Sequence, residues 1–399
     1  MIYLHIDTCQ GLGVSVIIKG INIFFWRKIM KKLSAVLLVL LLAASMVITC
    51  KKSGGNLIGI AMPETHVLRW VKDGTSLKAE AEKLGYTAEA QYGDANQSTQ
   101  NQQIQSFLTK GAKALIVGCI NDGVSSVVAE AARDKVVVIA YDRIIPNSAD
   151  YDYYITFNNF KVGVLQAQSI VDGLGLDSAS GPKYITLFAG SPTDGNAFFF
   201  FDGAMSVLNS YIDSGKLVVV GPYPRTSADT GNFQRIATEN WQAPIAKTRM
   251  EGLLANDALN VTLDAILAPN DTLARAIIEA CKADAKYGNR LPVVTGQDAE
   301  LASATSIKNG EQYSTIFKDT AKLAEAAILL ADQVLKGQPV NIPGAVLASG
   351  DLRSIGDTGR KVVNAYLLDP ILVTRSNLNV PIDAEFYDRS DAIILGAGL

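Results

Sequence analysis

Short apolar runs alternate with longer segments of helical period through the first half of the chain. Near-continuous runs of Val, Ile and similar residues are typical of parallel strands that are buried on both faces. Apolar residues that recur every three or four positions are typical of helices that lie against such a sheet. The pattern therefore predicts a βαβα series. Its strands are expected at Leu57–Met62, 114–118 and 136–140, and its helices at 67–84, 97–110 and 123–133.

A second series of the same kind follows along the chain. A length of 399 residues exceeds what one ordinary hydrophobic core holds. The two series therefore predict an α/β protein with two similar lobes, each a parallel sheet covered by helices. In the second series, strands are expected at 184–189, 217–220, 265–268 and 293–295, and helices at 196–211, 243–255 and 272–285.

The N-terminus carries a pattern that is typical of export. Lys31 and Lys32 precede an apolar segment that ends just before Cys50. A basic start followed by a short apolar segment is typical of a signal sequence, and this segment is shorter than an ordinary membrane span. The expected parts are a leader at 1–49, with translation starting at Met30, and a polar tether at 50–55.

Composition adds limits on the partners. Hydrophobic residues make up 48% of the chain and charged residues 19%, as in ordinary globular α/β proteins. The formal net charge of −3 gives no basic field for a polyanion, so nucleic acid is not expected as a partner. Cys119 and Cys281 remain once the leader is removed, and their spacing indicates buried free thiols rather than a disulfide framework or a metal site.

Motifs that would indicate an enzyme are missing from the exported part of the sequence. It holds one histidine, His66, which is too few for a His-metal cluster, and no Gly-x-Ser-x-Gly elbow. It also holds no phosphate-binding Gly-Lys-Ser/Thr loop, so ATP hydrolysis would belong to a partner subunit. Neither catalysis nor a cofactor is therefore expected. The alternative from another class is a glycosidase that uses paired carboxylates from Asp142, Asp194 and Asp298.

Planar polar side chains follow the ends of several predicted strands. Ligands of open α/β sheets bind at the carboxyl ends of the strands, where loops and helix N-termini meet. Forked Arg, Asp and Asn groups can each satisfy two hydrogen bonds of a vicinal diol, and an aromatic face covers the apolar C–H patch of a sugar ring. The candidates for a sugar site are Arg69, Asp142, Arg143, Asp194, Asn196, Asn270, Asp298 and Lys318, with Trp70 and Trp241 as aromatic faces.

These candidates also have structural interpretations. Asp194, Asn270 and Asp298 precede predicted helices, where such residues cap the first turn. A single Trp is as often part of a core as of a binding site, and Arg143 and Lys318 could be solvated surface charges. The recurrence of charged groups at successive strand ends favours a binding site over these readings of single residues.

Six short stretches lie in the same order along this chain as in one known family. They are Gly59-Ile60-Ala61-Met62-Pro63, Arg69-Trp70, Tyr141-Asp142-Arg143, 190–197, Gly296-Gln297-Asp298-Ala299-Glu300 and Phe317-Lys318-Asp319. In them the chain resembles the periplasmic sugar-binding proteins of ABC transporters, in the branch of the xylose, multiple-sugar and glucose/galactose binders. The resemblance extends from residue 56 to about residue 376, and the leader resembles that of spirochaetal glucose/galactose-binding lipoproteins.

The resemblance implies a periplasmic-binding-protein type I fold, with two lobes that close on a ligand about a three-stranded hinge. It also implies where the chain crosses between the lobes. The expected crossings lie near 157–158, 317–319 and 340–344, so that one lobe comprises 56–157 plus 319–340 and the other 158–318 plus 341–399.

The function implied by the resemblance is capture of a monosaccharide and its delivery to an ABC transporter permease. Cys50 would carry lipid and anchor the protein to a membrane in the periplasm. The ten candidates above would contact the sugar, and His66 would tune which sugar is accepted. No oxygen-rich calcium loop is present, so no structural metal is expected. D-glucose or D-galactose is favoured, with xylose or another pentose as the alternative; a sugar-responsive repressor and an adhesin are alternatives of other classes.

Overall fold

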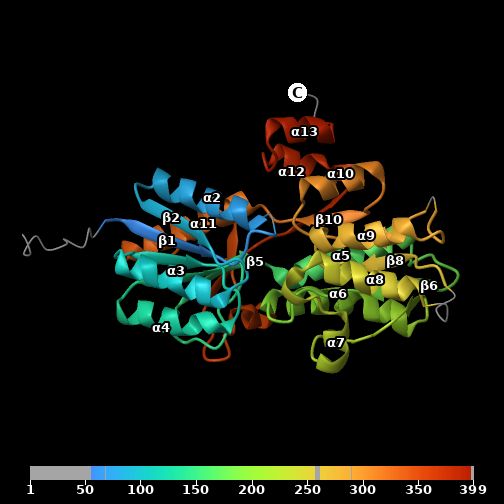
Figure 1. The fold of residues 1–399 in the computed structure, drawn as a ribbon, viewed down its shortest axis with the longest axis horizontal. Coiled ribbons are helices and arrows are strands. Elements are labelled where there is room, and N and C mark those ends of the chain that lie inside the picture. The colour runs from blue at the N-terminus through green and yellow to red at the C-terminus, as the bar shows by residue number, and fades with distance from the viewer. Residues whose placement is uncertain (1–54, 68, 257–260, 289, 397–399) are drawn as a thin grey trace, which may run out of the picture. The chain divides into compact units, whose positions relative to one another are not determined.

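The computed structural model describes residues 55–67, 69–256, 261–288 and 290–396 (Figure 1). The predicted leader with Met30, the lipidation candidate Cys50 and nearly all of the predicted tether lie outside these residues. Across the described ranges, no helix combines the length and the apolar character needed to cross a bilayer.

A seven-stranded sheet forms the centre of the first lobe. Its neighbouring strands are parallel except for one antiparallel pair at an edge. In spatial order the strands are β11 (Ala345–Leu347), β12 (Asn364–Leu368), β5 (Tyr153–Phe157), β4 (Val137–Tyr141), β3 (Ala114–Val117), β1 (Leu57–Met62) and β2 (Thr87–Tyr92).

Helices cover both faces of this sheet. Successive side chains of each strand point to opposite faces, so an apolar strand contributes to one core on each side. Along β1, Ile58 and Ile60 enter one apolar core, whereas Leu57 and Ala61 enter another. The helices of this lobe are α2 (Arg69–Lys83), α3 (Gln97–Thr109), α4 (Ser125–Arg133) and α11 (Thr320–Leu335). Figure 1 shows α2 and α11 together over the sheet, with α3 and α4 on its other side.

The second lobe contains a four-stranded parallel sheet and a separate antiparallel pair. The parallel strands are, in spatial order, β7 (Leu217–Val219), β6 (Lys183–Leu187), β8 (Ala265–Leu267) and β9 (Val293–Val294), and the pair is β10 (Ser314–Phe317) with β13 (Ile371–Thr374). The helices are α5 (Asn159–Leu174), α6 (Gly195–Asp213), α7 (Thr230–Ile236), α8 (Ala243–Leu254), α9 (Asp271–Ala283) and α10 (Leu301–Asn309). The C-terminal helices α12 (Asn379–Asp383) and α13 (Arg389–Leu395) lie beside α10 (Figure 1).

Part of the chain after residue 340 belongs to a different lobe from the one predicted. The predicted third crossing at 340–344 assigned residues 341–399 to the second lobe, but β11 and β12 belong to the sheet of the first lobe. The reason is strand pairing: β12 lies parallel to β5, with Leu368 opposite Phe157. The chain therefore stays in the first lobe from α11 through β12 and crosses for the last time between residues 368 and 371, where β12 gives way to β13.

The predicted elements of both series are present, with bounds that differ by no more than two residues. Within the two series the prediction omitted β2, β5, α5 and α7, and after them it gave no ranges for α10, α12, α13 and the strands β10 to β13. Cys119 and Cys281 are buried free thiols, as expected.

Candidate functional site

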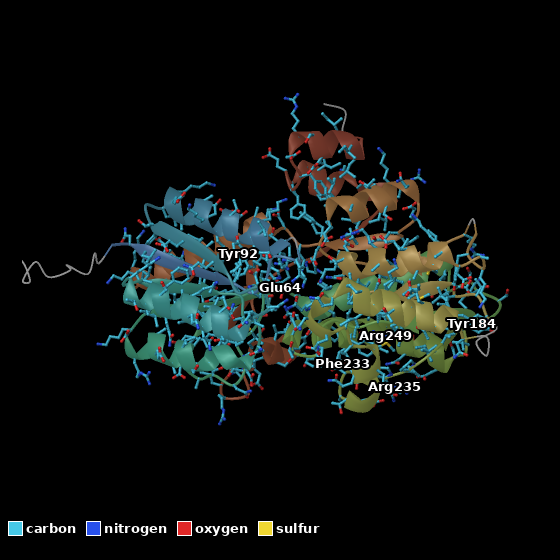
Figure 2. The ribbon with its side chains drawn as sticks, in the orientation of Figure 1. Glu64, Tyr92, Tyr184, Phe233, Arg235 and Arg249 are labelled. Carbon is cyan, nitrogen blue, oxygen red and sulfur yellow. The ribbon has the colours of Figure 1, made fainter. Side chains whose placement is uncertain are left out.

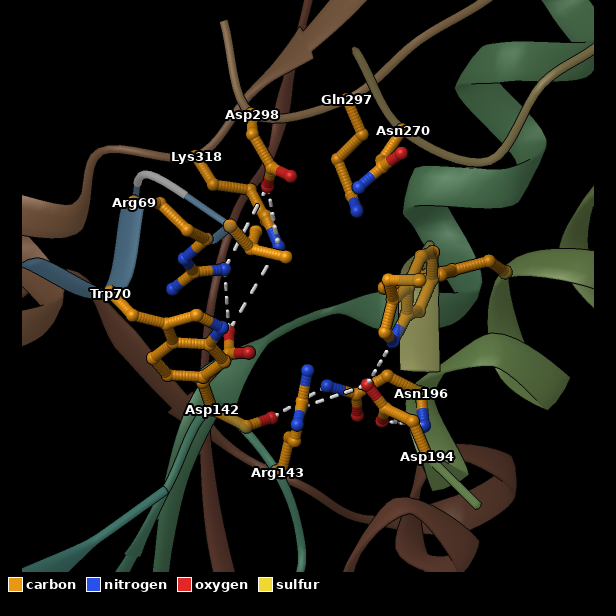
Figure 3. Close-up of a pocket in the computed structure, with 13 residues that line it drawn as sticks. Arg69, Trp70, Asp142, Arg143, Asp194, Asn196, Asn270, Gln297, Asp298 and Lys318 are labelled. Carbon is orange, nitrogen blue, oxygen red and sulfur yellow. Dashed lines mark hydrogen bonds and ion pairs between the residues drawn. The ribbon is translucent and has the colours of Figure 1, made fainter. Parts of the chain in front are cut away.

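One pocket between the lobes collects ten of the eleven candidate residues (Figure 3). Its cavity volume, counted as the space open to the centre of a water-sized probe, is about 30 Å³. Its lining consists of Val67, Arg69, Trp70, Asp142, Arg143, Asp194, Asn196, Phe200, Trp241, Asn270, Gln297, Asp298 and Lys318.

The lining residues sit where strands end and helices begin, as the strand-end argument predicts. Arg69 opens α2, Asp142 follows β4 directly, and Lys318 follows β10. Asp194 and Asn270 are the N-cap residues of α6 and α9. The pocket is therefore built from the carboxyl edges of the sheets of both lobes.

Four side chains form the first charge cluster of the pocket: Arg69, Asp142, Asp298 and Lys318 (Figure 3). Arg69 Nη1 lies 3.1 Å from Asp142 Oδ1 and 3.8 Å from Asp298 Oδ1. Lys318 Nζ lies 3.2 Å from the same Asp298 oxygen and 3.9 Å from Asp142 Oδ1. Asp73 holds Arg69 from behind, with its Oδ2 2.7 Å from Arg69 Nη2. Because Arg69 belongs to the first lobe and Asp298 to the second, this cluster joins the lobes.

A second charge cluster is centred on Arg143. Its Nη2 donates a hydrogen bond to Glu64 Oε1 at 3.0 Å within the first lobe. Figure 2 shows Glu64 at the junction of the two lobes. Arg143 Nε lies 2.8 Å from Asp194 Oδ2 of the second lobe, and Trp241 Nε1 donates to the same oxygen at 3.2 Å. Both clusters thus connect the lobes, and the described structure is closed around the pocket.

The charges of the lining residues balance. Arg69, Arg143 and Lys318 are opposed by Asp142, Asp194 and Asp298, so three positive charges meet three negative charges. Behind the lining, Glu64 and Asp73 add two buried carboxylates that contact Arg143 and Arg69. The pocket therefore has no excess of positive charge for an anion, which favours a neutral ligand. Within the described residues, no group of three or more His, Cys, Asp or Glu side chains could hold a metal ion.

Burial and neighbouring charges act in opposite directions on these groups. Burial favours the neutral form of Asp142, but Arg69, Lys318 and Arg143 outweigh it and lower the pKa of this carboxyl. Burial likewise opposes the charge on Arg69, but nearby carboxylates, Asp142 foremost, raise its pKa well above its usual range. Burial dominates at Asp194, whose pKa is raised although Arg143 opposes the shift. Asp142 and Arg69 therefore remain ionised at neutral pH.

Two tryptophans contribute the aromatic surface. The guanidinium carbons of Arg69 and Arg143 lie 4.8 Å and 4.9 Å from the ring centroid of Trp70. Trp70 therefore aligns both forks by cation–π contact. Trp241 occupies space that Gly190 leaves open, since a Cβ atom at Gly190 would come within 2.0 Å of the Trp241 ring. Both rings line the pocket and also belong to the largest buried apolar cluster of the described residues.

Three lining residues have left-handed backbone conformations, which are unfavourable for residues other than glycine. Their φ angles are 60° at Asp142, 55° at Trp241 and 94° at Asp298. At Asp142 the conformation is held by its carbonyl oxygen, which accepts hydrogen bonds from the Tyr154 hydroxyl at 2.7 Å and the Asn196 amide at 2.8 Å. Strained residues of this kind concentrate at binding sites, where the surrounding structure fixes them.

The helix-capping interpretation is right for two candidates and wrong for the third. Asp194 Oδ1 accepts a hydrogen bond from the backbone N–H of Asn196 at 3.0 Å, and Asn270 caps α9 in a similar way. Asp194 still directs its other oxygen, Oδ2, toward Arg143. Asp298 does not cap α10, whose N-cap residue is Glu300. Its carboxylate is committed to the pocket.

Several pocket atoms are buried without a hydrogen bond to any described residue. They are Gln297 Oε1, Asp298 Oδ1 and Arg143 Nε, although the last two have charged neighbours. Buried polar atoms that lack a partner carry a free-energy cost, which a bound ligand can remove. Figure 3 shows the side chain of Gln297 directed into the pocket beside Asn270. Gln297 Oε1, which has no charged partner, is therefore a position where a ligand hydroxyl group could donate a hydrogen bond.

The structure separates His66 from the other candidates. Its Nε2 lies 3.1 Å from the backbone oxygen of Asn240, and it is not part of the lining. The sequence argument missed Gln297, Phe200 and Val67. Gln297 lies inside one of the six quoted stretches, directly before Asp298. Its position in the sequence therefore indicated a place in the pocket, although its residue type did not.

Comparison with known proteins defines the class. Residues 58–339 match the family model described as a periplasmic binding protein domain, so the chain belongs to that family. The chain is 42% identical over 339 residues to a multiple sugar-binding periplasmic receptor of Rhizobium radiobacter, covering 84% of this chain and 92% of that protein. It is 34% identical over 336 residues to a D-xylose-binding periplasmic protein of Escherichia coli, covering 84% of this chain and 92% of that protein.

A solved structure supports the same class. An ABC transporter solute-binding protein of Clostridium phytofermentans, with bound β-D-glucose, has a TM-score of 0.75 and 34% identity, covering 84% of this chain and 99% of that chain. These relatives confirm the predicted family and the type I fold. They are receptors and binding proteins, which confirms that the chain is not an enzyme and overturns the glycosidase alternative.

Proposed function

We propose that this protein captures a neutral monosaccharide between its lobes and delivers it to the permease of an ABC transporter. The observation that carries the proposal is the pocket itself, which combines balanced charge, forked side chains and buried oxygen atoms without hydrogen bonds. A sugar hydroxyl donates and accepts at once, so it can satisfy such atoms without adding charge. The sugar-binding relatives support the same ligand class.

D-glucose is the favoured ligand. Two structures that share 34% and 31% identity with this chain contain bound glucose. D-galactose remains a second hexose candidate. The pentose alternative draws support from the two D-xylose-binding relatives, which share 33% and 34% identity.

Calorimetric titration of the purified protein tests the proposal. The panel comprises D-glucose, D-galactose and D-xylose, with D-glucose 6-phosphate and D-glucuronate as charged analogues of similar shape. We expect saturable binding of D-glucose and at least about tenfold weaker binding of both anions, because a buried charge without a partner costs more than 1.4 kcal/mol. Tighter binding of D-xylose than of either hexose would establish the pentose alternative. Binding of none of the three sugars would refute the proposed function.

We also propose that the protein is exported and anchored by lipid at Cys50. The basic residues and the apolar segment before Cys50 support this proposal. Each buried CH₂ group of an acyl chain contributes about 0.8 kcal/mol to membrane binding. Cys50→Ser should therefore move the protein from the membrane fraction to the soluble fraction. Membrane association that is the same for the wild type and this variant would contradict lipidation at Cys50.

A further inference from the structure

The dipeptide Phe386–Tyr387 lies between α12 and α13, beyond the residues that match the family model. Both side chains are buried, in an apolar cluster with α10 and the β10–β13 pair. The dipeptide is outside the pocket. Its contacts nevertheless reach the residues next to Asp298 and Lys318, and a residue one helical turn after Arg69.

Tyr387 supports the loop that carries Asp298. Its hydroxyl group donates a hydrogen bond of 2.6 Å to the backbone oxygen of Ala299. Ala299 follows Asp298 directly, and both have positive φ angles, 47° and 94°. Two successive residues in this region are costly, so they persist only when surrounding contacts fix them. Tyr387 supplies one such contact and thereby helps to aim the Asp298 carboxylate.

Phe386 supports the strand that carries Lys318. Its ring packs edge-to-face on Phe317, with a centroid separation of 5.0 Å and an interplanar angle of 74°. Edge-to-face aromatic pairs contribute stability beyond their buried area. Phe317 is the last residue of β10 and directly precedes Lys318. The dipeptide therefore stabilises the second lobe at the two places from which Asp298 and Lys318 enter the pocket.

Lys72 brings the first lobe to the same dipeptide. It lies on α2, one turn after Arg69. Its ammonium group donates a hydrogen bond to the backbone oxygen of Phe386 and lies 3.6 Å from the centroid of the Phe386 ring. Burial lowers the pKa of this ammonium group, although Asp73, Asp319 and, from the C-terminal segment, Asp391 and Asp388 attract it. This contact joins the lobes outside the pocket.

We propose that Lys72 and the Phe386–Tyr387 dipeptide form a closure latch, which holds the lobes together once a sugar is bound and positions Arg69, Asp298 and Lys318. The inference rests on the proposed function, because the latch acts on the ligand-bound closed form. Opening the lobes would separate Lys72 from Phe386 and return the ammonium group to water. The latch therefore slows release of the sugar without touching it.

The test compares variants of the full-length protein in D-glucose binding. Lys72→Met keeps the aliphatic stem and removes the charge, and we expect about five- to twentyfold weaker binding, mostly from faster dissociation. Lys72→Arg keeps the charge and the ring contact and should restore most of the affinity. Tyr387→Phe removes only the hydroxyl group and should weaken binding about three- to tenfold. Lys78→Met is the matched control, since Lys78 lies on the same helix and its charge partner is the exposed Glu82.

Three readouts separate a latch from a merely structural role. Stopped-flow fluorescence gives the dissociation rate, thermal melting of the sugar-free protein gives its stability, and small-angle scattering with glucose gives the degree of closure. We expect Lys72→Met to dissociate faster and to close less completely, with a melting temperature like that of Lys78→Met. An unchanged dissociation rate in Lys72→Met, beside a wild type that binds glucose, would overturn the latch alone. A wild type that binds no sugar of the panel would overturn the proposed function and the latch with it.

Discussion

Replacing Asp298 with Ala tests the central charge cluster of the pocket. The carboxylate lies 3.2 Å from Lys318 Nζ and 3.8 Å from Arg69 Nη1, and 4% of the side chain is exposed. Its Oδ1 accepts no hydrogen bond from a described residue and is therefore available to a sugar hydroxyl group. We expect Asp298→Ala to bind D-glucose much more weakly, because both a ligand contact and the charge balance are lost.

The magnitude follows from the contacts. A hydrogen bond to a charged group contributes about 1.5 to 3 kcal/mol. Its loss corresponds to an increase in Kd of roughly ten- to 150-fold. The charge of the pocket would also become more positive by one unit, because Arg69 and Lys318 would share Asp142 as their remaining lining partner. We therefore expect the variant to discriminate less against D-glucuronate relative to D-glucose than the wild type does.

Two further variants at this position separate binding from folding. Asp298→Asn keeps one acceptor but makes the same charge change, so its affinity should lie between those of the wild type and Asp298→Ala. Asp298→Gly removes the same carboxylate but relieves the φ angle of 94°, so it should bind as weakly as Asp298→Ala and be more stable by about 1 kcal/mol. Calorimetric titration and thermal melting measure both effects. An unchanged Kd in Asp298→Ala with a lowered melting temperature would refute the role in binding.

Two more predictions concern the packing and the titration of the second lobe. Gly190→Ala should weaken glucose binding about tenfold and lower the free energy of unfolding by roughly 1 to 3 kcal/mol, because a Cβ atom there would come within 2.0 Å of the Trp241 ring. Calorimetric titration and thermal melting measure the two effects. An unchanged affinity for glucose would contradict this prediction. Burial, with the nearby charge of Glu300, raises the pKa of Asp271 well above its usual value, so the folded protein takes up a proton more readily than the unfolded chain, whose Asp pKa is about 3.9. Between the pKa of Asp271 in the folded protein and that in the unfolded chain, the free energy of unfolding should rise as the pH falls, by up to about 1.4 kcal/mol per pH unit. Asp271→Asn should reduce this dependence on pH. Urea unfolding at pH 7 and pH 5 measures it, and the same dependence in the wild type and the variant would contradict the prediction.

The helices and strands were predictable because most of them are strongly patterned. The inner strands of a parallel sheet are buried on both faces, and β1 and β3 are uniformly apolar and buried. The edge strand β2 was missed, since Thr87–Tyr92 is mostly half exposed and contains no continuous apolar run. The continuation of the chain in the first lobe through β12 was also out of reach, because local sequence does not encode the pairing of β12 with the distant β5.

The pocket was predictable to the extent that it is made by strand ends. Asp142 and Lys318 follow strands directly, so the rule for open sheets places them at the pocket. His66 lies three positions before Arg69. Arg69, at the start of α2, lines the pocket, whereas His66 contacts the backbone of Asn240 and does not line it. Gln297 carries no charge that would mark it in a sequence, and its side chain became informative only once its buried Oε1 was seen to lack a partner.

The charge balance of the pocket explains how a neutral ligand could drive closure. A ligand can shift the equilibrium between open and closed lobes only by the difference between its affinities for the two forms. The interlobe pairs of Arg143 with Asp194 and of Arg69 with Asp298 contribute to closure without a ligand, but their desolvation opposes it. Under the proposed function, a sugar would add a hydrogen bond to Gln297 Oε1, which receives none from a described residue. Affinity therefore depends on a small difference between large opposing terms, so contacts outside the pocket that favour the closed form can tune it as strongly as contacts with the sugar.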